Sequence, residues 1–441
     1  MLLTKTEREE YIPLLALESR TLPTNINLHL VPIEKFKTVL ITAFLQQSLE
    51  KETAAKTALL PAVLERGTRK YPTYRDIRIR LEELYGAELG LDVLKLGERQ
   101  ILAFSLEVIH DKFAPGEDLM RQGLTVLKSV LTEPFTEEGV FKKEYVMQEK
   151  EQLSKEILGL VNDKVNYALE RCIQKMCAGE RFGVYKYGNV EDLEDITPGG
   201  LYEYYQSLIS ENPLDIFIVG EIDPQKTFPL IEETFTFLRQ GMKKSLPQVE
   251  VQNKPKKPRY WEESLPVSQG KLTLGYRTNT AYRDEDYADL LFYNGILGGF
   301  PHSKLFQNVR EKASLAYYAF SRLEKHKGIQ LIGSGIESKN YEQAREIIEE
   351  QVENIKAGLI TDEEMENTKR ALINQYKIIG DSPSSLLGFF LDGIVGNRDE
   401  EVDCLIERFG KIKKNNVVGA AQKVALDSVY FLRSADNEGS E

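Results

Sequence analysis

The chain repeats itself at the scale of a whole domain, and no other feature of the sequence constrains its fold as strongly. FTEEGVFKKEYV in the first half is matched by ITDEEMENTKRAL in the second, a little over 200 residues later. A second pair, at a similar separation, is GNVEDLEDITPGGLYEYYQSLISENPLDIFIVG and GNRDEEVDCLIERFGKIKKNNVVGAAQKVALDSVYFLRS. Each copy mixes alternating apolar and polar runs, typical of strands, with long charged runs, typical of helices. The sequence therefore predicts two homologous α+β domains, each a mostly antiparallel sheet packed with several long helices.

The boundary between the copies is indicated by a change in composition. Between Arg239 and Ser264 the chain contains three prolines, many lysines and few large apolar residues, which is typical of an extended linker. We therefore predict an N-terminal domain at 1–238, a linker at 239–264 and a C-terminal domain at 265–441. A length of 441 residues agrees with two domains of about 200 residues each.

Composition excludes several classes of protein. Hydrophobic residues make up 41% and charged residues 29%, as in an ordinary globular protein. A net charge of −12 argues against nucleic acid or an anionic membrane as the main partner. No run of about 20 apolar residues indicates a membrane span. The N-terminal MLLTKTEREEYIPLL turns acidic before an apolar signal region could form, so we expect a cytoplasmic protein.

The residues that usually bind zinc are few and scattered. The chain has three cysteines that form no C-x-x-C pair, and no two of its four histidines share a helical turn. These residues are Cys172, Cys177, Cys404, His29, His110, His302 and His326. The cysteines are expected to be reduced thiols, and the chain is not expected to hold a catalytic zinc ion by itself.

One stretch nevertheless has the frame of a known zinc site. ALLPAVLERGT reads as a helix, a second helix ends at Gly86, and ELGLDV reads as a strand. This arrangement resembles the pitrilysin/insulinase family of inverted zincins, whose first helix carries H-x-x-E-H before a glycine-threonine turn. With Gly67-Thr68 as the anchor, the histidine positions fall on Ala58 and Ala62, and the glutamate position falls on Pro61.

None of these three residues can perform the chemistry that the motif implies. In the motif, two imidazoles one turn apart bind zinc, and the glutamate takes a proton from the zinc-bound water. Alanine has no lone pair to donate, and proline is not a base. The family's third ligand, a glutamate on a later helix, corresponds to Glu149 in VMQE. Without two imidazole partners Glu149 is expected to be an orphan ligand, that is, a leftover zinc-ligand position that cannot hold zinc tightly. The alternative is that Glu149 is an ordinary solvated or ion-paired helix glutamate.

The resemblance runs from about residue 22 to 435 and is closest in LLFYNGILGGFPHSKLFQNVREKASLAYYAFS. Here the family keeps a glycine-rich turn, an arginine and a tyrosine, which correspond to Gly298 and Gly299, Arg310, and Tyr317. The resemblance implies that the arginine and tyrosine bind substrate and stabilise the developing oxyanion at a zinc site, and that the glycines contact substrate. The alternatives are a local ion pair of Arg310 with Glu311, a half-exposed strand tyrosine, and a helix C-cap.

The family resemblance implies a processing-peptidase-like, non-catalytic subunit of the YmfF-like kind. Such a chain would form one half of a clamshell and would not be active alone. The expected partner is a homologous peptidase chain with an intact zinc motif, in a heterodimer, although the chain alone could form a homodimer. Zinc would belong to the partner, and this chain would bind no cofactor. Peptides or unfolded proteins would bind as an added strand at a sheet edge.

Two other readings remain open at this level. The chain could be a structural or peptide-binding scaffold with no peptidase role. It could also be a self-sufficient peptidase that uses a different metal site.

Overall fold

The computed structural model describes residues 17–235, 244–251 and 257–435. In these ranges no single helix has both the length and the apolar character needed to cross a membrane. One bent helix pair, 362–381 with 383–396, meets that criterion only when both helices are counted together.

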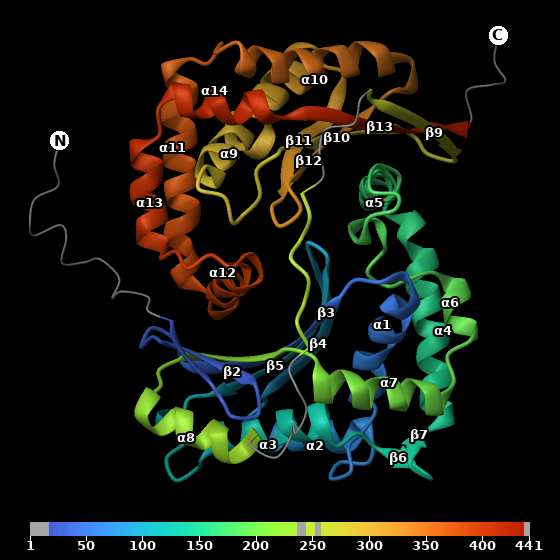
Figure 1. Ribbon diagram of the computed structural model, residues 1–441, viewed down its shortest axis with the longest axis vertical. Coiled ribbons are helices and arrows are strands. Elements are labelled where there is room, and N and C mark those ends of the chain that lie inside the picture. The colour runs from blue at the N-terminus through green and yellow to red at the C-terminus, as the bar shows by residue number, and fades with distance from the viewer. Residues whose placement is uncertain (1–16, 236–243, 252–256, 436–441) are drawn as a thin grey trace, which may run out of the picture. The chain divides into compact units, whose positions relative to one another are not determined.

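The chain forms two compact units whose segments alternate along the sequence (Figure 1). Unit 1 contains residues 1–157, 186–247 and 378–392, and unit 2 contains residues 158–185, 248–377 and 393–441. Each unit therefore includes a segment from the other half of the sequence. The predicted domains at 1–238 and 265–441 are defined by the duplication in the sequence, and they remain a prediction. The compact units are divided at other positions.

Unit 1 is built on a six-stranded sheet in the order β1-β2-β8-β3-β5-β4. Its strand pairs are antiparallel except for β2 with β8, which are parallel. Alternate residues of β3, such as Ile41 and Ala43, belong to the hydrophobic core on one face. The strands are β1 (Glu18–Thr21), β2 (Ile26–Pro32), β3 (Thr38–Ser48), β4 (Glu88–Leu96), β5 (Arg99–Ile109) and β8 (Leu214–Gly220).

Helices cover the core face of this sheet, with α1 and α3 packed against β5. The two helices predicted before ELGLDV are observed as α1 and α2, and the second ends at Glu83 instead of Gly86. The helices of unit 1 are α1 (Lys51–Glu65), α2 (Tyr74–Glu83), α3 (Leu119–Thr132), α4 (Lys143–Gly159), α6 (Val190–Glu194), α7 (Pro198–Glu211) and α8 (Pro224–Phe235). A small hairpin, β6 (Thr136–Glu137) with β7 (Val140–Phe141), precedes α4.

Unit 2 is built on a five-stranded sheet in the order β11-β12-β10-β13-β9. Only β13 and β9 pair in parallel. The strands are β9 (Arg259–Leu265), β10 (Gly270–Arg277), β11 (Ala316–Glu324), β12 (Ile329–Ile336) and β13 (Ala425–Ser434). The end of the predicted linker 239–264 is therefore a strand of this sheet, whereas its residues 239–243 and 252–256 lie outside the described ranges.

The helices of unit 2 come from both halves of the chain. They are α5 (Lys164–Met176), α9 (Tyr287–Asn294), α10 (Tyr341–Lys356), α11 (Asp362–Lys377), α13 (Val402–Lys411) and α14 (Lys414–Lys423), with π-helical turns η5 (Gly295–Gly299) and η6 (Phe306–Lys312). Helix α12 (Pro383–Gly396) crosses the boundary between the segments of the two units. Thr361 and Glu364 have the sequence spacing of a capping box, and they form one at the start of α11.

Helix α5 is the contribution of the first half of the sequence to unit 2. A break near residues 162 and 163 separates it from α4. Helix α4 ends at Gly159, and the Asp163 side chain caps α5 by accepting from the Asn166 amide. The apolar stripe of α5, which includes Leu169 and Ile173, then packs against Leu331 of β12 and against β13, with β10 between these two strands. The buried thiols of Cys172 and Cys177 lie in the same cluster.

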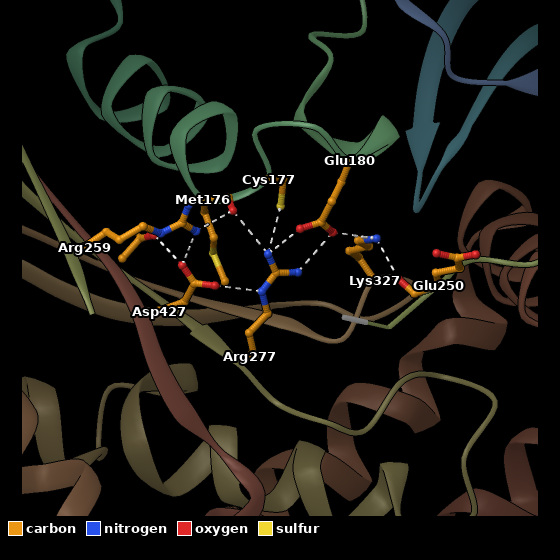
Figure 2. Close-up of polar contacts among 9 residues, drawn as sticks. Met176, Cys177, Glu180, Glu250, Arg259, Arg277, Lys327 and Asp427 are labelled. Carbon is orange, nitrogen blue, oxygen red and sulfur yellow. Dashed lines mark hydrogen bonds and ion pairs between the residues drawn. The ribbon is translucent and has the colours of Figure 1, made fainter. Parts of the chain in front are cut away.

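A buried charge cluster fixes the loop after α5 to this sheet (Figure 2). The Arg277 guanidinium donates to both carboxylate oxygens of Glu180, at 2.5 and 3.1 Å, and to Asp427 at 3.0 Å. Lys327 lies 2.9 Å from Glu180 and donates to the Glu250 carbonyl at 2.7 Å. Arg259 donates to Asp427 at 2.6 Å. Each buried charge in the cluster therefore has an opposite charge beside it.

Candidate functional site

The three degenerate motif positions line one wall of a pocket in unit 1. Helix α1 continues through Pro61, although proline cannot donate the backbone hydrogen bond of an inner helical residue. Ala58, Pro61 and Ala62 lie beside a space that is also lined by residues of β4 and α4. This pocket has a volume of about 170 Å³. The structure thus brings together the positions that the motif alignment singles out.

Glu149 lies in the same pocket, where it forms an ion pair. It is on α4 and only 7% exposed. The Nε of Arg66 donates to its Oε1 at 2.5 Å, and a second guanidinium nitrogen contacts the same oxygen. A guanidinium therefore neutralises Glu149, as in the ion-paired alternative.

Arg66 is a residue of this site that the motif alignment does not single out. Arg66 directly follows α1 and precedes the Gly67-Thr68 anchor. Its position next to the motif could therefore have marked it as a candidate residue of the site. Its guanidinium also lies 5.9 Å from the Tyr145 ring centroid, on the same helix as Glu149. These contacts hold a positive charge beside the family's third-ligand position.

The pocket is acidic. Four carboxylates are among its lining residues, and none of the lining residues is basic; the acids are Glu65, Asp92, Glu149 and Glu156. Partial burial raises the pKa of Glu65, Arg78 opposes this, and the nearby charge of Glu149 raises it further. The pocket lining therefore carries an excess of acidic side chains, which Arg66 and Arg78 offset only in part.

These residues do not fit a catalytic zinc ion. Catalytic zinc sites take three protein ligands as a rule, and here the two helical positions carry only methyl groups. The remaining carboxylate, Glu149, already binds Arg66. Among the residues described by the structure, no group of three or more histidine, cysteine, aspartate and glutamate side chains could hold a metal ion. The pocket therefore retains the backbone arrangement of the zinc motif but lacks the side chains that would bind the metal.

The Gly67-Thr68 anchor is a structural turn. A Cβ at Gly67 would lie 2.3 Å from the Pro72 carbonyl oxygen, so only glycine fits. The Thr68 amide donates to the Tyr71 carbonyl at 2.7 Å, and the Tyr71 amide donates to the Thr68 hydroxyl at 2.9 Å. The turn thereby sets the path of the chain from α1 to α2 whether or not a metal is bound.

Arg310 and Tyr317 both belong to unit 2. Arg310 is on η6, with its Nε 3.6 Å from Glu311 and its guanidinium 4.5 Å from the Phe306 ring centroid. Tyr317 lies near the start of β11, an edge strand, and is 72% exposed. The contact with Glu311 matches the local alternative, but it is exposed and therefore weak. Both side chains are accessible from solvent.

Gly298 and Gly299 lie in η5 and differ in their surroundings. Gly298 is buried, and a Cβ there would lie 2.7 Å from the amide nitrogen of Ser321 and from the Leu305 side chain. Gly299 is exposed. Gly298 is therefore needed for close packing of η5 on β11, whereas contact of either glycine with substrate remains a prediction.

Comparison with known proteins identifies the family. Residues 195–372 match the family model described as peptidase M16 inactive domain. A Bacillus subtilis (strain 168) protein described as probable inactive metalloprotease YmfF is 37% identical over 411 residues, which are 92% of this chain and 96% of that protein. The chain belongs to the peptidase M16 family. The resemblance to inverted zincins is thus confirmed, and this M16 chain is similar over nearly its whole length to a member considered inactive.

Two further matches agree with this M16 assignment. A solved structure of a conserved protein from Enterococcus faecalis V583 has a TM-score of 0.88 at 30% identity, covering 96% of this chain and 99% of that one. An uncharacterized zinc protease, YmxG of Bacillus subtilis (strain 168), is 32% identical over 111 residues, 24% of this chain and 27% of that protein. The predicted α+β fold is confirmed, with a mostly antiparallel sheet and long helices in each unit.

Proposed function

We propose that this chain is the non-catalytic, substrate-binding subunit of a two-chain zinc peptidase. A homologous chain with an intact H-x-x-E-H would provide the zinc ion, the water and the general base. The observation that carries the proposal is the state of the degenerate pocket, where Ala58 and Ala62 replace the imidazoles and Arg66 neutralises Glu149. Any hydrolysis must then take place at a zinc site on another chain.

Arg310 and Tyr317 are the residues that we propose act on the partner's zinc site. A phenol and a guanidinium can donate hydrogen bonds to a substrate carbonyl and to an oxyanion. Tyr317 is 72% exposed, and the Arg310 side chain is 43% exposed with only a surface ion pair. Their availability supports a role in trans, in which Gly298 and Gly299 would shape the adjoining turn.

Peptide substrates would bind as an added strand. Strand β4 is an edge strand that pairs only with β5, and most of its residues are exposed or half-exposed. The backbone groups of an edge strand can bind an extended peptide. At Val93 such a peptide would replace two side-chain contacts, because the Val93 amide donates to Asp92 at 2.6 Å and the Val93 carbonyl accepts from Lys186 at 2.9 Å. Leu91, Asp92 and Val93 of β4 also line the pocket. This edge is therefore our proposed peptide-binding site within unit 1.

The trans-acting role is tested in a mixed complex. The chain would be combined with an M16 chain of similar length from the same organism that retains H-x-x-E-H, and hydrolysis of an unfolded protein would be followed. Loss of one oxyanion donor typically costs about 10²–10³ in kcat, so Arg310→Ala and Tyr317→Phe should each lower kcat at least tenfold. Arg370→Ala on α11 and Tyr74→Phe on α2, both exposed, serve as controls.

The same assay decides between this role and a second candidate. The contacts of Arg310 with Glu311 and Phe306 fit a structural or peptide-binding scaffold without a peptidase role. Unchanged hydrolysis in both variants would support the scaffold and reject the trans-acting role. Stoichiometric zinc and peptide cleavage in the purified chain alone would instead establish a self-sufficient peptidase.

A further inference from the structure

A serine, a histidine and an aspartate lie in hydrogen-bond contact near one edge of the unit 1 sheet. Ser19 of β1 is opposite His29 of β2 in the antiparallel pair, and the Ser19 Oγ is 2.8 Å from the His29 Nδ1. The other ring nitrogen, Nε2, is 3.1 Å from the Oδ1 of Asp215 on β8. A hydroxyl, an imidazole and a carboxylate therefore follow one another across three neighbouring strands.

The carboxylate of this group is buried and held by oriented amides. Asp215 is 1% exposed, and it accepts from Asn27 at 2.8 Å and from Gln46 at 2.6 Å. The Asn27 amide is oriented by the Thr21 hydroxyl, which donates to its oxygen at 3.0 Å. The Gln46 amide is oriented by Arg99, which donates to its oxygen at 2.9 Å. Burial alone would raise the pKa of Asp215, but the imidazole and the two amides hold it below its ordinary value.

The partners of the imidazole decide which of its nitrogens carries the proton. A carboxylate only accepts hydrogen bonds, so the Nε2 that faces Asp215 must be the N–H. In the neutral imidazole Nδ1 then has the lone pair, and this nitrogen faces the Ser19 hydroxyl. His29 is only 7% exposed and stacks on Phe217 with 4.5 Å between ring centroids, which fixes the ring. The imidazole is thus placed to accept the proton of Ser19, which is itself exposed.

We propose that Ser19 is an activated nucleophile, with His29 as its general base and Asp215 as the residue that positions this base. Groups of this kind occur on unrelated folds and are recognised by geometry and by the role of each member. In the known protease triads Nε2 faces the serine, whereas here Nδ1 does, and either ring nitrogen can accept a proton. The proposed subunit role is not needed for this activity.

The reaction class is hydrolysis of an activated ester. The Ser19 oxygen attacks the carbonyl carbon while its proton passes to the His29 Nδ1, and the leaving group takes that proton as its C–O bond breaks. Water then attacks the acyl-serine, its proton passes to Nδ1 and on to the Ser19 oxygen, and one ester and one water give one acid and one alcohol. Aryl esters are the expected substrates, because the contacts described above include no oxyanion donor and a good leaving group lessens the need for one.

Labelling of the full chain with a fluorophosphonate tests the nucleophile. The Ser19 oxygen would bond to phosphorus, fluoride would leave as the P–F bond breaks, and the serine proton would pass to His29. Peptide mass spectrometry should find the adduct on Ser19, and Ser19→Ala should abolish it. Ser207→Ala, which removes an exposed serine of α7, should leave the labelling unchanged. No adduct on Ser19, or equal labelling of Ser19 and Ser207, would overturn the proposal.

Two further variants locate the base and the residue that positions it. Loss of a general base typically costs about 10²–10⁴ in rate, so His29→Gln should slow both the labelling and the Ser19-dependent hydrolysis of p-nitrophenyl acetate at least tenfold. Asp215→Asn should slow both as well. It should also shift the nitrogen-15 NMR signals of His29, because an amide that donates to Nε2 moves the ring proton to Nδ1.

Circular dichroism melting checks that these two variants fold. Ser19 is exposed, so Ser19→Ala tests the nucleophile even if a substitution at a buried position unfolds the protein. Wild-type rates in folded His29→Gln and Asp215→Asn would mean that the group only satisfies a buried carboxylate, and the proposal would be wrong.

Discussion

At the scale of single residues, the ion pair of Arg66 with Glu149 stabilises the degenerate pocket. Glu149 is nearly buried, and a buried carboxylate without a partner is costly because it loses hydration. In a zinc-binding relative a metal ion would supply the positive charge, whereas here a guanidinium held 2.5 Å away does so. Losing the metal ligands therefore did not leave an uncompensated charge in the fold.

Removal of Arg66 should expose this dependence. Arg66→Ala is expected to lower the free energy of unfolding by about 1–3 kcal/mol, since a buried charged group loses its partner while water reaches the site through the partly exposed arginine position. The double variant Arg66→Ala with Glu149→Gln should recover much of that loss. Urea denaturation measures both, with the exposed Arg75→Ala as the control. A single variant no less stable than that control would contradict the pairing.

The sequence predicted one part of this site and missed another for a physical reason. Ala58, Pro61 and Ala62 share one face because helical spacing alone brings them together. The ion pair joins residues 83 positions apart, so it depends on how α1 packs near α4. Periodicity within one helix carries no information about that packing.

At the scale of secondary-structure elements, the sequence was most informative where the signal is local. The break between α4 and α5 follows from an asparagine and a capping aspartate, and the capping box of α11 follows from Thr361 and Glu364. Strand β9 was read as linker because its partner lies far away in the chain, with Arg259 opposite Ser428 in a parallel pair. Its many charged residues are typical of an exposed edge, which composition alone cannot distinguish from a linker.

The packing of η5 on β11 gives a prediction at this scale. Gly298→Ala should destabilise the protein by about 1–3 kcal/mol, because its Cβ would lie 2.7 Å from the backbone nitrogen and the Cβ of Ser321. In contrast, Gly419→Ala on α14 meets no atom within 4 Å and should stabilise by about 0.5–1 kcal/mol. Thermal denaturation followed by circular dichroism compares the two. Tolerance of alanine at Gly298 would mean that η5 is free to move from β11.

At the scale of the whole molecule, the notable feature is the exchange of segments between the sequence halves. Residues 158–185 belong to unit 2 although they precede its strands by about a hundred positions. The apolar stripe of α5 and the charge cluster around Arg277 hold them there. The duplication predicted two similar domains, but it could not predict this exchange, because a helix with one apolar face packs equally well on either sheet.

Removal of Arg277 tests how strongly the exchanged segment is held. Burial alone would raise the pKa values of Glu180 and Asp427; instead, hydrogen bonds from Arg277, together with Lys327 for Glu180 and with Ser428 and Arg259 for Asp427, hold both below their ordinary values. Arg277→Met should therefore cost about 3–5 kcal/mol at pH 7, since it leaves two buried carboxylates poorly compensated. Fluorescence of Trp261, the only tryptophan and part of β9, reports the unfolding of unit 2 in urea.

The pH dependence separates this electrostatic effect from loss of packing. Because the folded pKa values of the two carboxyls are lowered, their stabilisation is present above the ordinary values of 4.5 and 3.8 and is lost as the pH falls through the lower folded values. Without Arg277 each carboxyl loses hydrogen bonding that lowers its pKa, so both folded pKa values should rise and the variant should lose less stability than wild type as the pH falls. The difference in unfolding free energy between wild type and Arg277→Met should therefore narrow as the pH falls from 7 through the ordinary values of 4.5 and 3.8 and below them, whereas the exposed Arg370→Met should track wild type throughout. A gap that stays constant across this range would mean that Arg277 holds the segment by packing and not by charge.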